Sequence, residues 1–492
     1  MHAYRLWFAC ASVTALAGAL VACPTPRRGD EPRGATPAAA PADARVDDAA
    51  VTPHEATARD ASPPDAARAQ RDPDGNDDPT EAADATDATG ATDRAARPLG
   101  EGALVQVGKP PLGWQRICDL RPFGGRLYLA HANQPLGSDG ATITTYDPSD
   151  AARPFRLAFD WNRFGEPTKG GGGGQGFLRV HAIDGRLFVP DADPPYGGLG
   201  ALDHGTEGYV FVSDARGAFA PARGPHKALP VRPAPGADGR AGAAVLPRAY
   251  HVLDVIKFRG LLYASTGSVP PTARAWAGPS PGALHVASPE LDRFTYALGF
   301  PSPYPGGVWR LTYLVRFRDA VYAGLQDYDG KSPYDYVVLR PPAGRDLLEE
   351  GDARGARITE LGAAFTLRWY ADGGALYWIA GTRDGDVQLR RTTDGATWTE
   401  LPLPAELGRP TDVKRFRGQL VVLGERGLAT LGPNGDGPAR VLTRVVEKKT
   451  PFAVDDVFCA APLGVLGDVL YVGGQRGAVL YRFEEAAPDA GR

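Results

Sequence analysis

The sequence predicts an all-β protein whose folded part is a seven-bladed β-propeller. One short pattern occurs seven times: a hydrophobic residue, a turn carrying Gly or Asp, and then an aliphatic residue that is usually followed by an aromatic one. Repeats of short strands and tight turns, spaced by about 45 to 75 residues, are typical of propeller blades. The copies span residues 123–128, 183–188, 258–263, 317–322, 372–377, 416–421 and 466–471.

Two more positions recur in register with this pattern. Seven residues before each aliphatic anchor the side chain is apolar, as a face packed against another blade requires. One residue earlier the side chain points to the opposite face, is mostly polar, and is expected to line the centre of the propeller. The apolar set is Leu120, Val180, Val255, Leu314, Trp369, Val413 and Leu463, and the second set is Asp119, Arg179, Asp254, Tyr313, Arg368, Asp412 and Pro462.

The third copy shows how a blade is built. Residues 250–258 are expected to form the innermost strand, Arg259-Gly260 the turn, and 261–265 the return strand, because Gly accepts a positive φ at little cost. A third strand at 283–288 and a fourth near 294–296 complete four antiparallel strands. The last blade has one strand too few, since only 477–483 follows its anchor pair. Residues 103–107 are predicted to supply the missing strand and close the ring.

The N-terminal part is expected to be an export signal followed by a spacer. Residues 1–22 have a weakly basic start and an apolar run too short for a stable membrane span, and they end in Leu20-Val21-Ala22-Cys23. This tetrapeptide resembles the lipobox of bacterial lipoproteins, which implies lipidation of Cys23. Pro24 follows the Cys where Asp would be the cue for retention in the inner membrane, so we expect anchoring in the outer membrane, on its periplasmic or cell-surface side. An ordinary secretory signal with a chance Cys is the alternative.

Composition and charge set the remaining domain boundaries and limit the partners. Residues 23–98 are rich in Ala, Pro and Asp, and from 24 onward they carry 9 Arg, no Lys and 16 acidic residues, which predicts a disordered linker. The propeller is assigned to 99–485, and 486–492 is expected to be a disordered tail. Because 99–492 has a net charge near +2, nucleic acid is not expected as a partner. We expect a monomer held to the membrane by its lipid, with a glycan or an envelope protein as ligand.

A hairpin near residue 394 carries a family resemblance. Thr392-Thr393-Asp394-Gly395-Ala396-Thr397-Trp398 resembles the Asp-box of sialidase-like propellers, shortened by one residue, and 212–219 looks like a second, decayed copy. The resemblance implies a structural role, in which Asp ties the turn and Trp fills the space between blades. Sialidase catalysis in that family also needs an Arg-Ile-Pro segment, and here Arg116-Ile117-Cys118 is the nearest string. Arg179, Arg310 and Arg368 remain candidates for a cationic cluster that binds a carboxylated sugar.

The two cysteines of the propeller, Cys118 and Cys459, are predicted to form a disulfide that closes the ring. Both are placed on innermost strands, one in the first blade and one in the last, and these blades are neighbours in a closed ring. Disulfides persist in exported domains. Two separate buried thiols are the alternative.

The sequence contains no motif that names a reaction, so catalytic residues stay unknown. His181 and His251, beside Asp254 or Asp119, are candidates for a general base with its orienting acid, or for hydrogen-bonded lining residues. The loop residues Asp191, Asp193, Asp203 and His204 are candidates for a divalent cation site, or for simple turn caps, and no other cofactor is expected. Two functions follow: a binding or scaffold module, or a glycan-active enzyme (a sialidase-like hydrolase or a lyase) with its site at the channel mouth.

Overall fold

The computed structural model describes residues 98–486 except for a set of internal ranges. The predicted signal, the predicted linker up to residue 97 and residues 487–492 of the predicted tail lie outside the described residues. Among the residues it describes, no helix has the length and apolar character needed to cross a membrane. The internal ranges left out are 112–115, 133–140, 162–175, 192–206, 215–216, 218, 220–242, 248–250, 268–281, 288–293, 301–308, 328–334, 354–356, 359, 363–364, 383–384, 447–449 and 453–457.

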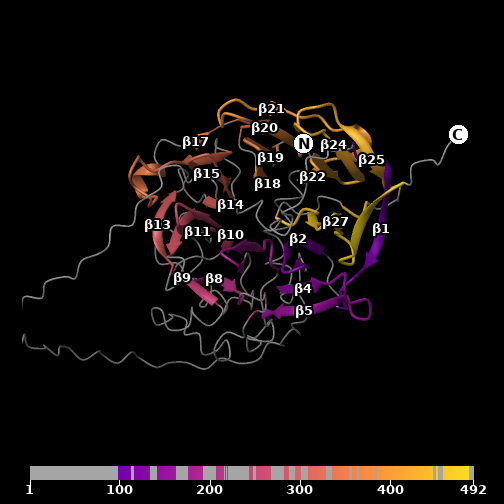
Figure 1. The fold of residues 1–492 in the computed structure, drawn as a ribbon. Coiled ribbons are helices and arrows are strands. Elements are labelled where there is room, and N and C mark those ends of the chain that lie inside the picture. The colour runs from indigo at the N-terminus through magenta and orange to yellow at the C-terminus, as the bar shows by residue number, and fades with distance from the viewer. Residues whose placement is uncertain are drawn as a thin grey trace, which may run out of the picture. The chain divides into compact units, whose positions relative to one another are not determined.

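Seven four-stranded antiparallel sheets form the seven blades, which confirms the predicted fold (Figure 1). In Figure 1 the first strand of each blade lies towards the centre and the fourth at the periphery. The blades are, in order, β2 (Arg116–Phe123), β3 (Arg126–Ala132), β4 (Thr142–Tyr146) and β5 (Phe155–Asp160); β6 (His181–Ile183), β7 (Arg186–Pro190), β8 (Glu207–Val212) and β9 (Ala243–Pro247); β10 (His251–Phe258), β11 (Leu261–Gly267), β12 (Gly282–Ala287) and β13 (Thr295–Phe300); β14 (Trp309–Phe317), β15 (Ala320–Asp327), β16 (Tyr336–Leu339) and β17 (Arg357–Ile358); β18 (Phe365–Asp372), β19 (Ala375–Gly381), β20 (Val387–Thr392) and β21 (Thr399–Glu400); β22 (Pro410–Phe416), β23 (Gln419–Gly424), β24 (Gly427–Thr430) and β25 (Arg440–Arg444); and β26 (Leu463–Leu466), β27 (Val469–Gly473) and β28 (Leu480–Glu485) with β1 (Gly102–Gly108).

The ring closes through β1, as the sequence predicts. This strand is the fourth of blade 7 and pairs with β28, so that Leu104 lies opposite Phe483. The residues just before β1 are also fixed to the ring. Gly100 N donates to Glu485 Oε1 at 2.5 Å, and Leu99 is 2% exposed in the core between blades 6 and 7. The first and last strands of the propeller therefore share one sheet, and that sheet has no missing strand.

The repeated apolar positions form the cores between blades. All seven members of the predicted apolar set are buried, from Val180 at 0% to Trp369 at 6% exposed. Leu120, for example, packs with Tyr471 and Leu480 of blade 7, whereas Val180 packs with Phe123 and Tyr128 of blade 1. Each innermost strand thus contributes to the core that it shares with the preceding blade, which explains why the position recurs.

The aromatic residue of the repeat reaches into the next blade. Tyr322 of blade 4 lies against Gly395 of blade 5, where a Cβ would stand 2.1 Å from the tyrosine hydroxyl and where φ is +80°. Tyr128 and Gly217, and Tyr377 and Gly435, repeat this contact. The glycine of the Asp-box-like hairpin is therefore required by its neighbour as well as by its own backbone.

Hydrogen bonds hold the hairpin at 392–398 together. Asp394 Oδ1 accepts from the N–H groups of Ala396 and Thr397 at 2.8 and 2.7 Å. Trp398 is 8% exposed, and its Nε1 donates to Tyr336 Oη at 2.7 Å. These contacts describe one hairpin, and the family resemblance itself stays a prediction.

The two ends of the blades differ. One end, here called the turn face, carries the tight turns between first and second strands, such as Arg417-Gly418 with φ of 47° and 73°. The opposite end, here called the loop face, carries the connections from second to third strands and from each blade to the next, since antiparallel strands alternate in direction. Second-to-third connections on the loop face run from 191–206 in blade 2 to only 425–426 in blade 6.

Candidate functional site

The polar position of the innermost strands joins neighbouring blades by hydrogen bonds. Asp254 Oδ1 accepts from the N–H of Val255 at 3.0 Å, and Oδ2 accepts from Leu314 N–H of blade 4 at 2.7 Å. A β-bulge at Leu253, the residue just before Asp254, interrupts the ladder there. Asp119 and Asp412 repeat the same two bonds, with Leu120 and Val180 as donors to the first and Val413 and Leu463 as donors to the second.

Arg368 crosses the propeller axis from blade 5. Its Nη2 donates to Cys118 O of blade 1 at 2.6 Å and to Ala460 O at 3.1 Å. Its Nη1 lies 3.7 Å from Asp119 Oδ1, and its Nε lies 3.9 Å from Asp412 Oδ1. Only 4% of Arg368 is exposed, so this guanidinium fills space on the axis while it links blades 1, 5 and 6.

Arg179 enters the same region from blade 2. Its guanidinium carbon lies 3.8 Å from the centroid of the Tyr313 ring of blade 4, and its Nη2 donates to Leu367 O of blade 5 at 3.1 Å. Burial alone lowers the pKa of Arg179, but electrostatic interactions with Tyr313 and with the carboxylates of Asp119, Asp254 and Asp412 outweigh burial and leave this pKa above its usual value. Arg179 therefore stays charged although it is 6% exposed.

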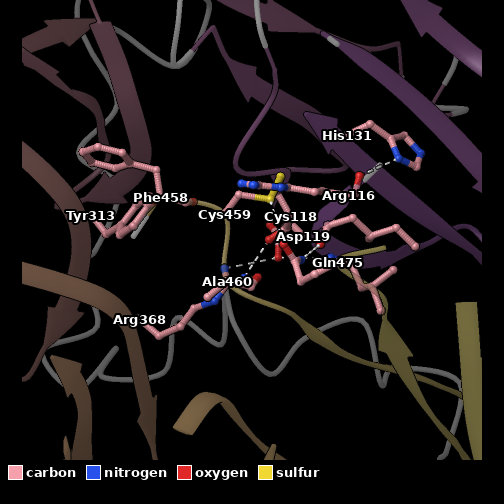
Figure 2. Close-up of a disulfide and its surroundings, with 12 residues drawn as sticks. Arg116, Cys118, Asp119, His131, Tyr313, Arg368, Phe458, Cys459, Ala460 and Gln475 are labelled. Carbon is pink, nitrogen blue, oxygen red and sulfur yellow. Dashed lines mark hydrogen bonds and ion pairs between the residues drawn. A yellow bond between two sulfur atoms is a disulfide. The ribbon is translucent and has the colours of Figure 1, made fainter. Parts of the chain in front are cut away.

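The segment before β26, here called the axial strap (Phe458, Cys459 and Ala460), completes the filling of the axis. Tyr313 Oη donates to Phe458 O at 2.5 Å, and Cys459 forms the predicted disulfide with Cys118 at a Cα separation of 4.6 Å. Figure 2 shows Arg368 and Tyr313 reaching towards the strap from one side, with Gln475 on the other.

The placement of Cys459 on an innermost strand was wrong. The strand of blade 7, β26, begins only at Leu463, and Pro462 stands just before it at the position that is polar in other blades. Proline has no N–H to give to a ladder, and the chain ahead of it leaves the sheet and lies across the axis. Gln475 supports the strap, since its Nε2 donates to Ile117 O at 2.7 Å and its Oε1 lies 3.7 Å from Cys459 Sγ. Pro462, which occupies a position that is polar in most other blades, was the sequence feature that could have shown that the innermost strand begins after Cys459.

The predicted central residues are thus close together and buried. Asp119, Arg179, Asp254, Tyr313, Arg368 and Asp412 are between 1% and 6% exposed. Burial raises the pKa of Asp412, against the lowering effects of Lys414 and of two backbone N–H donors. Each of the three carboxylates is bound by backbone N–H groups, so their first role is to hold blades together. A ligand-binding role for this set stays a prediction.

The structure brings one histidine of the candidate pairs onto its carboxylate. His181 Nε2 lies 2.5 Å from Asp254 Oδ1, and the His181 side chain is 15% exposed whereas that of Asp254 is 3% exposed. Because an ionised carboxylate only accepts, the hydrogen of this contact belongs to Nε2 of His181. His251 begins β10, and its side chain lies outside the described residues.

Of the four candidate metal ligands, only Asp191 lies within the described residues. Its Oδ2 accepts from Tyr209 N–H at 2.9 Å and its Oδ1 from Val252 N–H of blade 3 at 3.1 Å, so it also ties two blades together. Asp193, Asp203 and His204 lie in 192–206, outside the described residues. No group of three or more His, Cys, Asp or Glu residues suited to a metal occurs in the described part of the chain. The cation site stays a prediction.

Comparison with known proteins gives a likeness of fold alone. No family model and no curated protein matches the chain. PorZ, a surface component of the type IX secretion system of Porphyromonas gingivalis, has a TM-score of 0.45 and 14% identity over 76% of this chain and 47% of its own, so this chain spans about half of PorZ. A catalytically inactive virginiamycin B lyase from Staphylococcus aureus has a TM-score of 0.44 and 8% identity over 78% of this chain and 100% of its own. BamB from Moraxella catarrhalis has a TM-score of 0.39 and 11% identity over 79% of this chain and 100% of its own.

Proposed function

We propose that the protein is a lipid-anchored binding module of the cell envelope, which presents the loop face of its propeller to a ligand. The observation that carries this proposal is the filled axis. Two arginines, three aspartates and a disulfide link the blades to one another and make the ring a preorganised support. Rigid scaffolds that carry connections of unequal length on one face are the usual frame of binding sites.

The lipid anchor is the second part of the proposal. It is supported by the sequence Leu20-Val21-Ala22-Cys23 and by the acidic, Pro- and Ala-rich stretch that follows. Cys23→Ser is expected to move the protein from the detergent-extractable membrane fraction to the soluble envelope fraction, because no acyl chain is attached. Radiolabelled palmitate incorporation checks the chemistry directly. A Cys23→Ser protein that is still firmly held in the membrane would contradict the anchor.

A glycan-active enzyme is the second candidate, favoured by the contact between His181 and Asp254. A histidine held through Nε2 by a carboxylate is the arrangement in which the neutral tautomer presents Nδ1 as a general base. A panel of envelope glycans separates the two functions when binding and product release are measured on the same samples. Binding without product supports the module. Turnover that is lost in His181→Gln, with the ring still folded, supports the enzyme instead.

A further inference from the structure

A second ring of side chains lies one step nearer to the turn face than the polar set on the axis. Residues two apart on an extended strand point to the same side and are about 7 Å apart along it, so the residues two positions after the polar set share its orientation. In blades 1 to 7 they are Arg121, His181, Ile256, Val315, Tyr370, Lys414 and Gly464. The three basic members stand in blades 6, 1 and 2, and blade 7, between the first two of these, contributes only a glycine. Arg121, His181 and Lys414 are called the basic arc below.

Arg121 stands beside the carboxylate of Asp119 at the axis. Its Nε donates to Val180 O at 3.0 Å, and Asp119 Oδ2 accepts from the N–H of the same residue at 2.9 Å. Asp119 Oδ1 in turn lies 3.7 Å from Nη1 of the axial Arg368. Arg121 is partly exposed whereas Arg368 is buried, so Arg121 is the one of these two cations that solvent reaches.

Lys414 occupies the equivalent place beside Asp412. Lys414 is partly exposed, and its Nζ lies 4.8 Å from the centroid of the Tyr370 ring. Burial raises the pKa of Asp412 and Lys414 lowers it, so the ammonium is close enough to act on this carboxylate. Asp412 Oδ1 lies 3.9 Å from Nε of the same Arg368, and the strands that carry Arg121 and Lys414 therefore approach one another at the axis.

The arginine and the lysine of the basic arc differ in their partners from other basic side chains of the turn face. Lys257 Nζ lies 2.7 Å from Asp184 Oδ1, and Arg417 Nε lies 2.6 Å from Asp468 Oδ1. Within the described part of the chain, the arginine of the arc contacts a carbonyl oxygen and the lysine an aromatic ring, and neither has a carboxylate oxygen within 4 Å. The terminal guanidinium nitrogens and the ammonium are thus donors that a ligand can use.

We propose that the basic arc binds the carboxylate of a small organic acid with an apolar body. A guanidinium matches a carboxylate with two parallel hydrogen bonds, and the ammonium adds a point charge beside it. Ile256 of blade 3, which follows His181 in the ring and is partly exposed, offers the apolar contact that small-molecule sites combine with a few polar groups. The inference goes beyond the proposed function, because it places a second site on the face opposite to the loop face.

The carboxylates beneath the basic arc favour a ligand with a single negative charge. Asp119, Asp254 and Asp412 lie one strand period deeper and are buried, and like charges repel strongly where water is scarce. A phosphate dianion carries two charges into this repulsion, whereas the single charge of a carboxylate is matched by Arg121 and Lys414. The site is therefore expected to prefer a monocarboxylate to phosphate.

Fluorine NMR on the full-length protein tests the site, with para-fluorobenzoate as the probe and its line width as the measure of binding. Arg121→Gln is expected to weaken binding by about tenfold and Lys414→Gln by about threefold. Arg417→Gln and Lys257→Gln are the matched controls on the turn face, and each is expected to change the affinity by less than about twofold. The neutral para-fluorobenzyl alcohol is expected to bind about tenfold more weakly than the acid.

Each outcome decides the proposal. It is overturned if the wild type leaves the probe line unbroadened, if either arc variant that folds binds like the wild type, or if the controls lose as much affinity. Should Arg121→Gln fail to fold without its bond to Val180, Lys414→Gln decides, since it removes no hydrogen bond within the described residues. Inorganic phosphate that displaces the probe more strongly than acetate overturns the carboxylate class, and equal binding of the alcohol overturns the role of charge. None of these results bears on the loop face, which the glycan panel tests.

Discussion

Arg368 on the axis and Arg417 on the turn face both link one blade to others, yet their surroundings differ. Arg368 is 4% exposed and binds two carbonyl oxygens between two buried carboxylates. The Arg417 side chain is 38% exposed, and its partner Asp468 is 76% exposed. If its ion pair breaks, the exposed Arg417 can bind water instead, whereas the buried Arg368 has no water to take the place of its partners. The comparison teaches that burial, and not the number of charged contacts, decides which links hold this ring.

The largest effect is expected from the covalent link of the axis. Cys118→Ala/Cys459→Ala opens a loop whose ends are 341 residues apart, and it is expected to lower the free energy of unfolding by up to about 5 kcal/mol. Guanidinium denaturation without reductant measures the loss, and the reduced wild type is the control. A loss below about 1 kcal/mol would show that the noncovalent contacts close the axis alone.

The axial guanidinium comes next. Arg368→Met removes the guanidinium that lies between Asp119 and Asp412 and leaves two buried carbonyl groups without their donor, at an expected cost of about 4 kcal/mol in the free energy of unfolding. Arg368→Lys is the matched variant, and it is expected to recover only part of this loss because an ammonium cannot reproduce the fork. If Arg368→Met costs no more than a surface arginine in urea denaturation, the contrast between the two regions fails.

A pH titration extends the comparison to a neutral buried group. His131, which Figure 2 shows beside Arg116, is 0% exposed, and burial lowers its pKa to about 4 against the raising effect of the hydrogen bond with Arg116 O. The unfolded chain binds this proton near pH 6.5, so stability is present above that pH and is lost as the pH falls towards 4. The expected loss is about 3 kcal/mol. His131→Gln should flatten the dependence in this window, and an unchanged slope would assign it to other groups.

On the turn face, close packing and not charge is expected to give the larger effect. Gly395→Ala places a Cβ 2.1 Å from the Tyr322 hydroxyl at a φ of +80°, and about 2 kcal/mol of destabilisation is expected. Tyr322→Phe removes the obstructing oxygen, so the same substitution should cost less in that background. A double-mutant cycle by thermal unfolding measures the difference. Strictly additive effects would remove Tyr322 as the reason for this glycine.

The smallest effect is expected for the surface ion pair. Arg417→Ala should change the free energy of unfolding by about 0.5 kcal/mol or less, and the change should vanish in high salt, because Arg417 and Asp468 are solvated and the second partner, Glu485, keeps its hydrogen bond from Gly100 N–H. A loss of about 2 kcal/mol in the free energy of unfolding, well above that range, would show that an exposed ion pair on the turn face stabilises the ring as much as a buried axial contact does.

Much of the architecture was predictable because the repeat is dictated by packing that every blade needs. The apolar set from Leu120 to Leu463 and the closing strand near Leu104 follow from spacing counted along the chain. The pairing of Cys118 with Cys459 was also predicted, although Cys459 lies on the axial strap and not on an innermost strand. The axial strap was not predictable in the same way. Phe458 and Ala460 belong to no repeat. Their carbonyl groups accept hydrogen bonds from Tyr313 of blade 4 and Arg368 of blade 5, which are distant in the sequence.

The candidate site divides along a similar line. The ring of polar residues was found from its recurrence, but recurrence does not tell whether a carboxylate faces a ligand or a backbone N–H. Both carboxylate oxygens of Asp254 accept backbone N–H groups, and Oδ1 also contacts Nε2 of His181.

The position of β1 has a mechanical consequence. If the protein hangs from its N-terminus, a pull on a bound ligand is carried through Leu99 into the strand that closes the ring. The load runs along β1 and falls on all its pairs with β28 together, so the strand is sheared and not peeled. Should β1 still tear away, unravelling stops at Cys118, which is covalently fixed to Cys459 of the last blade. The slack released between Leu99 and that bond is at most about 70 Å of extended chain, and six blades remain loaded but intact behind it.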